Sequence, residues 1–245
     1  MTKILITGGC SFSECASDFI DTWPRHLARL LPEYNHVSTA MSSQGNGLIS
    51  RKIIYEIQHQ IKQGVDPKDI VVGIMWSGPD RHDIYIDTNP IGYSDNSGGW
   101  YENPTKFVKN QPIKNWYVFN SWWQNISLNK TYYKLFHNET MHLILTYEHI
   151  LRVQWFLKSL GIKYFMTCYM DTLFHSEQIK HPELKYLYDM IDLTTFLPVT
   201  GEYEWCKEKS SFDFPIKDDP HPGNDQHKEF TEKVVFPFLL LNRMV

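Results

Sequence analysis

The sequence predicts an α/β fold, a three-layer α/β/α sandwich around a mostly parallel central sheet. Short apolar runs alternate with longer amphipathic segments along the chain, which is the pattern of strands that alternate with helices. The run from Asp69 to Trp76 is apolar almost throughout, as expected for a strand that helices cover on both faces. At 245 residues the chain is long enough for one large core, so we expect a single domain over residues 1–245.

The first half of the chain predicts two strand-and-helix units. Lys3–Thr7 is a short apolar run that stops at two glycines, which indicates a buried strand followed by a loop. Thr22–Leu31 has a proline suited to a first helical turn and leucines on one face. A weaker strand near His36–Thr39 leads to a helix over Leu48–Lys62, where isoleucines recur every four residues. Asp69–Trp76 is the third strand.

The second half begins with a large aromatic-rich insertion, residues 83–138, in which the periodicity disappears. A helix over residues 139–161 follows, with Asn138 as its cap and a terminal glycine. The next expected elements are a strand over residues 162–170 and a short helix over residues 182–191. We expect the remainder of residues 171–211 to be irregular, and a last helix to be bent or interrupted by Pro237.

Composition excludes several classes of partner. The formal charge of −4 gives no basic surface for a phosphate backbone, so we expect no nucleic-acid partner. The beginning MTKILITGG lacks the apolar stretch of a signal peptide, and no run approaches the length of a spanning helix. We therefore expect a soluble, cytoplasmic protein without a membrane partner. Four cysteines without a CxxC pair suit a reducing compartment.

No cofactor or metal is expected. The chain contains no phosphate-binding loop and no dinucleotide-binding signature. His175 and His181 have no ligand spacing with other histidines or cysteines.

Polar side chains and glycines follow the expected strands. Because parallel strands present their carboxyl ends at one edge of a sheet, the loops after them should meet there. These loops contain a serine, glycines and small polar residues, and an aspartate and a histidine precede the last helix. The residues are Ser11, Gly45, Asn46, Ser77, Asp218 and His221. A serine combined with a histidine, an aspartate and backbone donors is typical of enzymes that form an acyl-enzyme.

These segments resemble the sequence blocks of the SGNH, or GDSL-type, hydrolases. GGCS, residues 8–11, resembles the first block, with Cys10 where the family usually has aspartate. SQGNGLI, residues 43–49, resembles the second block, and DDPHPGNDQH, residues 218–227, resembles the fifth. The third block departs from the family, since residues 76–80 lack the asparagine that contributes an oxyanion donor. The insertion lies outside the resemblance, which implies the flavodoxin-like fold of these hydrolases for the rest.

The resemblance implies a role for each site residue. Ser11 would be the nucleophile, His221 the general base, and Asp218 the carboxylate that orients the imidazole. Asp219 is the rival carboxylate, and the three-residue spacing to the histidine favours Asp218. The backbone N–H groups of Ser11 and Gly45 would face the oxyanion. The third donor would be the hydroxyl of Ser77 or the side-chain amide of Asn46.

The neighbours of these residues have plainer interpretations. Cys10 is expected to be a small buried filler, and His227 a helical residue that packs at a helix start. Arg81 and Asp83 follow the third strand, and we expect them to brace the insertion as a pair rather than to contact substrate. The run Trp116–Asn125 would form the insertion's own core in preference to a sugar-binding wall.

The predicted function is a serine esterase, a carboxylic ester hydrolase acting on an O-acyl ester of a small molecule or carbohydrate. A carbohydrate O-acetyl ester is the preferred substrate. Two alternatives stay open: a weakly active or inactive binding or structural module with the same fold, and an O-acyltransferase that uses the same serine. The sequence makes no prediction about the oligomeric state.

Overall fold

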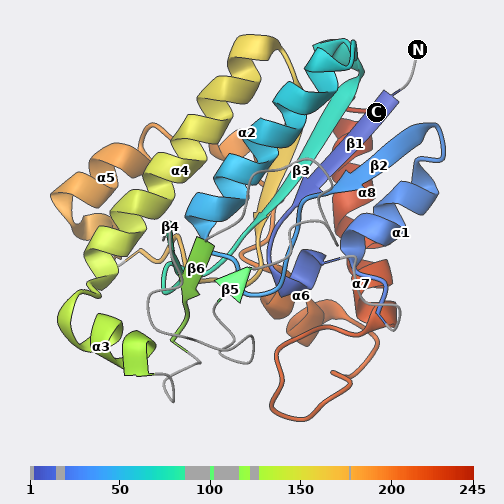
Figure 1. Ribbon diagram of the computed structural model, residues 1–245. Helices are drawn as coiled ribbons and strands as arrows, with labels where there is room; N and C mark the ends of the chain where they lie inside the picture. The colour runs from blue at the N-terminus through green and yellow to red at the C-terminus, as the bar shows by residue number, and fades with distance from the viewer. Residues whose placement is uncertain (1–2, 15–19, 86–99, 102–115, 122–126, 177) are drawn as a thin grey trace.

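Four parallel strands form the main sheet of the protein, in the order β2-β1-β3-β7 (Figure 1). They are β1 (Lys3–Gly8), β2 (Tyr34–Ser38), β3 (Ile70–Trp76) and β7 (Lys163–Cys168). The computed structural model describes residues 3–14, 20–85, 100–101, 116–121, 127–176 and 178–245. All four strands were expected, and β3 is buried at every residue because it lies inside the sheet, between β1 and β7. The fold is therefore mixed α/β, with a parallel sheet as predicted.

Successive residues of the strands pack into two hydrophobic clusters. Ile4 and Ile6 of β1 lie in one cluster with apolar residues of two helices, α2 (Asn46–Lys62) and α4 (Glu139–Leu160). Leu5 lies in the other cluster with residues of α1 (Trp23–Leu30), α7 (Asn224–Phe230) and α8 (Phe236–Leu241). Figure 1 shows α2 and α4 side by side along the sheet, and α7 near α1. The alternation follows from the two-residue period of a strand.

The helix ends that were predicted from a capping asparagine, a terminal glycine and a first-turn proline are confirmed. The side chain of Asn138 accepts a hydrogen bond from the backbone N–H of Met141 at 2.9 Å, at the start of α4. Gly161 ends α4 with φ 66°, a left-handed conformation that glycine adopts without strain. Pro24 lies in the first turn of α1, as expected.

The insertion contains local elements that the sequence pattern did not predict. A small antiparallel sheet in the order β4-β6-β5 consists of β4 (His82–Tyr85), β5 (Trp100–Tyr101) and β6 (Trp116–Phe119). It is followed by α3 (Ser127–Leu135). The other residues of the predicted insertion, at 86–99, 102–115 and 122–126, lie outside the described residues.

The region after β7 holds one expected helix and one missed helix. The expected helix is α5 (Pro182–Tyr188), and the missed one is α6 (Glu202–Lys209), in a part expected to be irregular. Between α7 and α8 the backbone is π-helical over Thr231–Val235, directly before the proline at position 237. Proline has no N–H to donate, so the α-helical pattern is interrupted close to it, as predicted.

Within the described part of the chain, no helix combines the length and apolar character that crossing a membrane requires.

Candidate active site

A cavity of about 460 Å³ is lined by residues that follow each of the four parallel strands. Ser11 follows β1, Ser42 follows β2, Arg81 follows β3 and Tyr169 follows β7. The segment 217–221, just before α7, completes one side of the cavity. The expectation that these loops meet at one edge of the sheet is confirmed. A larger surface groove of about 760 Å³ near α6 and α8 contains neither Ser11 nor His221.

A chain of short hydrogen bonds joins the two ends of the sequence inside this cavity. The Ser11 Oγ atom lies 2.7 Å from His221 Nε2, and His221 Nδ1 lies 2.5 Å from an Asp219 carboxylate oxygen. A carboxylate only accepts hydrogen bonds, so the neutral imidazole carries its proton on Nδ1 and accepts the Ser11 hydroxyl at Nε2. We call Ser11, Asp219 and His221 the reactive cluster. Its geometry is that of a serine whose proton can pass to a histidine held by an aspartate.

The carboxylate that contacts the His221 ring is that of Asp219, whereas the spacing had predicted that of Asp218. Asp219 also accepts the backbone N–H of His221 at 3.0 Å, which makes a tight turn that holds the carboxylate against its own histidine. Asp218 has a left-handed backbone with φ 66°, and no described hydrogen bond joins its side chain to His221. Partial burial acts to raise the pKa of Asp219, but the hydrogen bonds and charge of His221 outweigh it and hold that pKa below its ordinary value.

The backbone N–H of Gly45 is not available as the predicted oxyanion donor. It donates to an Asp83 carboxylate oxygen at 2.9 Å, and the N–H of Leu48 donates to the other oxygen at 2.8 Å. Gly45 and Leu48 belong to the start of α2, so Asp83 caps that helix from β4. Burial raises the pKa of Asp83, although these N–H groups oppose the shift. A side chain at position 45 would meet the backbone oxygen of Arg81 at 2.8 Å, which explains the glycine.

Asn46 and Ser77 are bonded to each other and do not line the cavity. The side-chain amide of Asn46 donates to the backbone oxygen of Ser77 at 2.9 Å and to the hydroxyl of Thr146 at 3.2 Å. The side-chain oxygen of Asn46 accepts the backbone N–H of Ser77 at 2.8 Å. Both residues are buried. We call Gly45, Asn46, Ser77 and Asp83 the framework cluster, because its bonds join the ends of β3 and α2 to α4 and β4.

Two of the predicted oxyanion donors, the N–H of Gly45 and the amide of Asn46, are therefore occupied by other acceptors. The hydroxyl of Ser77 has no hydrogen-bond partner in the part of the chain that the structure describes, but it does not line the cavity. Of the predicted donors, the backbone N–H of Ser11 is still free, since no acceptor for it occurs among the described residues.

Arg81 lines the cavity, whereas the sequence analysis expected it to brace the insertion as a pair with Asp83. Its guanidinium carbon lies 5.3 Å from the centre of the Tyr169 ring, and it is hydrogen-bonded to the side chain of Cys10. The carboxylate of Asp83 instead accepts the N–H groups at the start of α2, so Arg81 and Asp83 do not form a pair. The signal that could have identified Arg81 is its position directly after β3, at the edge where ligands bind.

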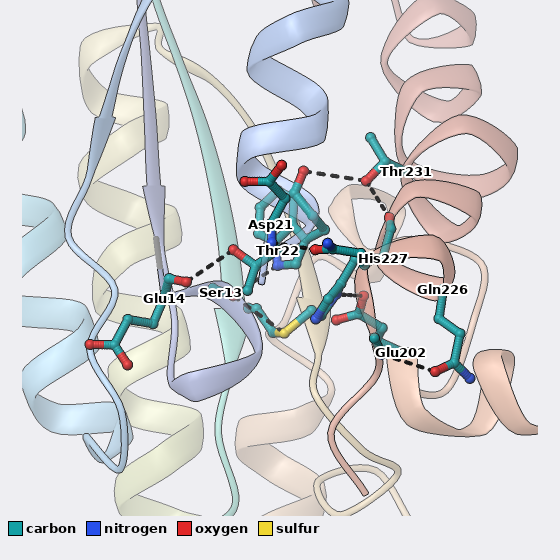
Figure 2. A network of polar contacts seen from close by, with 12 residues as sticks. Ser13, Glu14, Asp21, Thr22, Glu202, Gln226, His227 and Thr231 are labelled. Atoms are coloured by element: carbon teal, nitrogen blue, oxygen red, sulfur yellow. Dashed lines mark hydrogen bonds and ion pairs between the residues drawn. The ribbon is translucent and has the colours of Figure 1, made fainter. Parts of the chain in front are cut away.

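A polar network that includes Ser13, Glu14 and Thr22 fixes the turn that carries Ser11 (Figure 2). Ser11–Ser13 forms a single 3₁₀ turn after β1. The indole N–H of Trp23 donates to the Ser13 hydroxyl at 2.8 Å, and that hydroxyl donates to the sulfur of Met75 at 3.4 Å. The hydroxyl of Thr22 donates to the backbone oxygen of Glu14 at 3.2 Å. These contacts hold the turn against α1 and β3.

The same network extends to the helix that follows His221. Thr231 donates to the backbone oxygens of Trp23 at 3.3 Å and of His227 at 2.7 Å. His227 itself is buried and pairs with Glu202 at 2.7 Å, as Figure 2 shows. The prediction that His227 packs at the helix start is confirmed by this burial.

The described aromatic residues of the insertion pack among themselves. Tyr117 and Phe119 of β6 are buried, and the Phe119 ring stacks on Tyr132 of α3 at 4.1 Å between centres. This supports the core interpretation for the described residues, whereas residues 122–125 of the predicted aromatic run lie outside them.

The described residues contain no candidate metal site, and Cys10 next to Ser11 is buried. Cys10 is fully buried beside Ser11, as expected for a filler, and Cys15 lies outside the described residues. No group of three histidine, cysteine, aspartate or glutamate side chains that could hold a metal ion occurs in the part of the chain that was described.

The model of a family of unknown function, DUF6071, matches residues 14–236, and the chain belongs to this family. The match includes Asp219 and His221 and begins after Ser11. A comparison with curated proteins gave no match.

Proposed function

We propose that the protein is a serine esterase that cleaves O-acyl esters through an acyl-enzyme on Ser11. The observation that carries this proposal is the reactive cluster, with 2.7 Å between Ser11 Oγ and His221 Nε2 and 2.5 Å between His221 Nδ1 and Asp219. The strand order and the two hydrophobic clusters also support the three-layer sandwich of the SGNH hydrolases.

In the acylation half, the Ser11 hydroxyl attacks the ester carbonyl carbon. The Ser11 proton moves to His221 Nε2, a bond forms between Oγ and the carbonyl carbon, and the carbonyl electron pair moves onto oxygen. When the tetrahedral intermediate collapses, the bond to the leaving oxygen breaks and His221 returns the proton to that oxygen. The alcohol departs and the acyl group stays on Ser11. Asp219 stabilises the transient imidazolium and holds its orientation.

In the deacylation half, water replaces the alcohol. His221 takes one proton from the water while its oxygen bonds to the acyl carbon, and the second intermediate expels Ser11 Oγ, which recovers the proton. The products are a carboxylic acid and the free enzyme, with no change in oxidation state.

The cavity is large enough for a small-molecule ester. Its volume of about 460 Å³ lies in the range of small-molecule sites. Phe12 and Tyr169 contribute aromatic rings to the lining, and the Phe12 ring lies 4.9 Å from that of His221. We propose an acetyl ester of a carbohydrate hydroxyl as the substrate class.

The test compares ester hydrolysis by the native protein with that by Ser11→Ala. We expect the native protein to hydrolyse 4-nitrophenyl acetate, and the variant to lose at least about 10³-fold in kcat because the nucleophile is absent. Ser42→Ala is the matched control, since Ser42 lines the same cavity outside the reactive cluster. Equal rates for the native protein and Ser11→Ala, with both folded by circular dichroism, would contradict the proposal.

The framework cluster motivates a second candidate, a binding module with the same fold. Its occupied donors remove part of the oxyanion hole that the resemblance implies. Binding of an acetylated glycan that persists in Ser11→Ala, with no turnover of any ester, would favour this candidate. An acyltransferase would be distinguished by acyl groups recovered on an added alcohol in place of free acid.

A further inference from the structure

We propose that Arg81 binds the oxyanion of the tetrahedral intermediate, in place of the glycine and asparagine donors of the SGNH pattern. This inference rests on the proposed esterase function. It gives a catalytic role to a residue for which the family resemblance has none.

The first step is that the reaction needs an oxyanion donor in the cavity, and none of the framework residues 45, 46 and 77 lines that cavity. Negative charge develops on the former carbonyl oxygen, and preorganised donors in a water-poor site are usually the largest source of stabilisation. The N–H of Gly45 is held by Asp83, and the amide of Asn46 by Ser77 and Thr146. Moving either group to the cavity would leave a buried acceptor without its partner.

The second step is the position of Arg81. It lines the same cavity as Ser11 and His221, and its side chain is hydrogen-bonded to Cys10, the residue directly before Ser11. The guanidinium also lies 5.3 Å from the centre of the Tyr169 ring, which fixes it by a cation–π contact. The charge is thus held beside the nucleophile by groups from the ends of β1 and β7.

The third step is the unused hydrogen-bonding capacity of Arg81. Its Nε and Nη1 atoms are buried, and neither has a hydrogen-bond partner among the described residues. Burial acts to lower the pKa of Arg81, but Cys10, Tyr169 and Asp80 raise it above its ordinary value, so the side chain stays charged. A charged side chain that lines the cavity and has two nitrogen atoms without acceptors in the described chain is suited to an anion that forms there.

The fourth step is the chemistry. The guanidinium and the free N–H of Ser11 donate hydrogen bonds to the oxyanion as it forms, and both keep their protons throughout. A charge-assisted hydrogen bond is shorter and stronger than a neutral one, so one arginine can replace two amide donors. The rival explanation is that Arg81 recognises a carboxylate already present on the substrate, which would act on binding and not on the chemical step.

The experiment measures kcat and KM separately for a neutral and an anionic ester of the same phenol, 4-nitrophenyl acetate and 4-nitrophenyl hemisuccinate. We expect Arg81→Gln to lose about 10²–10³-fold in kcat for both esters, with KM changed by less than about threefold. Arg81→Lys keeps the charge without the planar donors and should lose less. Millimolar guanidinium chloride should restore part of the kcat of Arg81→Ala. This rescue compares one variant with and without guanidinium, so it does not depend on the stability of the other variants.

Two outcomes overturn the inference while the esterase proposal stands. One is an unchanged kcat in Arg81→Gln, and the other is a rise in KM confined to the hemisuccinate ester, which would make Arg81 a carboxylate-binding residue. A native protein that hydrolyses no ester, and whose Ser11 does not react with a fluorophosphonate, would overturn the proposed function and this inference with it.

Discussion

The reactive cluster and the framework cluster both include residues from loops at the carboxyl ends of parallel strands. Ser11 follows β1 in the reactive cluster, and Gly45 and Ser77 follow β2 and β3 in the framework cluster. In the reactive cluster, Ser11 and His221 bond to each other in an open cavity. In the framework cluster, the amide of Asn46 and the N–H of Gly45 are bonded to other parts of the protein. Position in the sheet therefore selects candidate residues, and hydrogen-bond occupancy decides which of them can act on a substrate.

The largest expected effect is a loss of kcat when Asp219, but not Asp218, is replaced by asparagine. Asp219→Asn replaces the carboxylate that accepts the His221 N–H, so the imidazole loses its orienting partner and the imidazolium its stabilising charge. We expect a loss of about 10⁴-fold in kcat, and less than about fivefold for Asp218→Asn, measured with 4-nitrophenyl acetate. The two variants differ by one position in the same loop, so they control for each other.

The opposite order of effects would restore the spacing-based assignment of Asp218. It would mean that the tight turn from Asp219 to the His221 N–H does not persist in the working enzyme.

A smaller effect is expected in the framework cluster, on stability and not on catalysis. Asn46→Ala removes the acceptor for the buried N–H of Ser77 and the donor to its backbone oxygen. We expect the free energy of unfolding to fall by about 2–4 kcal/mol, measured by urea denaturation, with kcat within about threefold where the variant is folded. Asn35→Ala, at an exposed position of β2, is the control. A loss of 10²-fold or more in kcat with unchanged stability would make Asn46 an oxyanion donor after all.

The order of elements and two members of the reactive cluster could be predicted from the sequence. Ser11 follows a clear apolar strand, and His221 precedes a helix in a segment resembling a known block. The choice between Asp218 and Asp219 depends on a left-handed backbone at Asp218, which spacing does not reveal.

The framework contacts could not be predicted, because they depend on partners from distant elements. The backbone N–H of Gly45 donates to Asp83 of β4, and β4 lies in an insertion whose sequence shows no strand periodicity. Helix α6 was missed for a related reason: only Glu202 and Cys206 of its residues are buried, so no apolar stripe marks it.

The last expected effect concerns the pH dependence of stability and involves three histidines outside both clusters. Burial, with a contribution from Arg152 and Arg51, lowers the pKa of His149 to about 3, and burial lowers that of His36 and His142 to about 4. An unfolded histidine titrates near 6.5, so below that pH the unfolded chain binds protons that the folded chain does not. The contribution of these histidines to the free energy of unfolding is therefore fully present above about pH 6.5. It decreases as the pH falls toward 4, by up to about 1.4 kcal/mol per pH unit for each histidine.

Urea denaturation between pH 7.5 and 4.5 measures this slope. His149→Gln should reduce it, while His175→Gln, at an exposed position, should leave it unchanged. The pKa of Asp219 is held low, so its carboxylate stays ionised over this interval and the reactive cluster keeps its orienting charge. Identical slopes in the native protein and both variants would show that His149 does not remain neutral.

The reactivity of Ser11 toward a fluorophosphonate tests the central claim most directly, because the reagent needs an activated serine and no knowledge of the substrate. The account predicts a single covalent adduct on Ser11 by peptide mass spectrometry, formed at a rate that falls by several orders of magnitude in His221→Ala. An unmodified Ser11 in the folded native protein, or a rate that does not depend on His221, would contradict it.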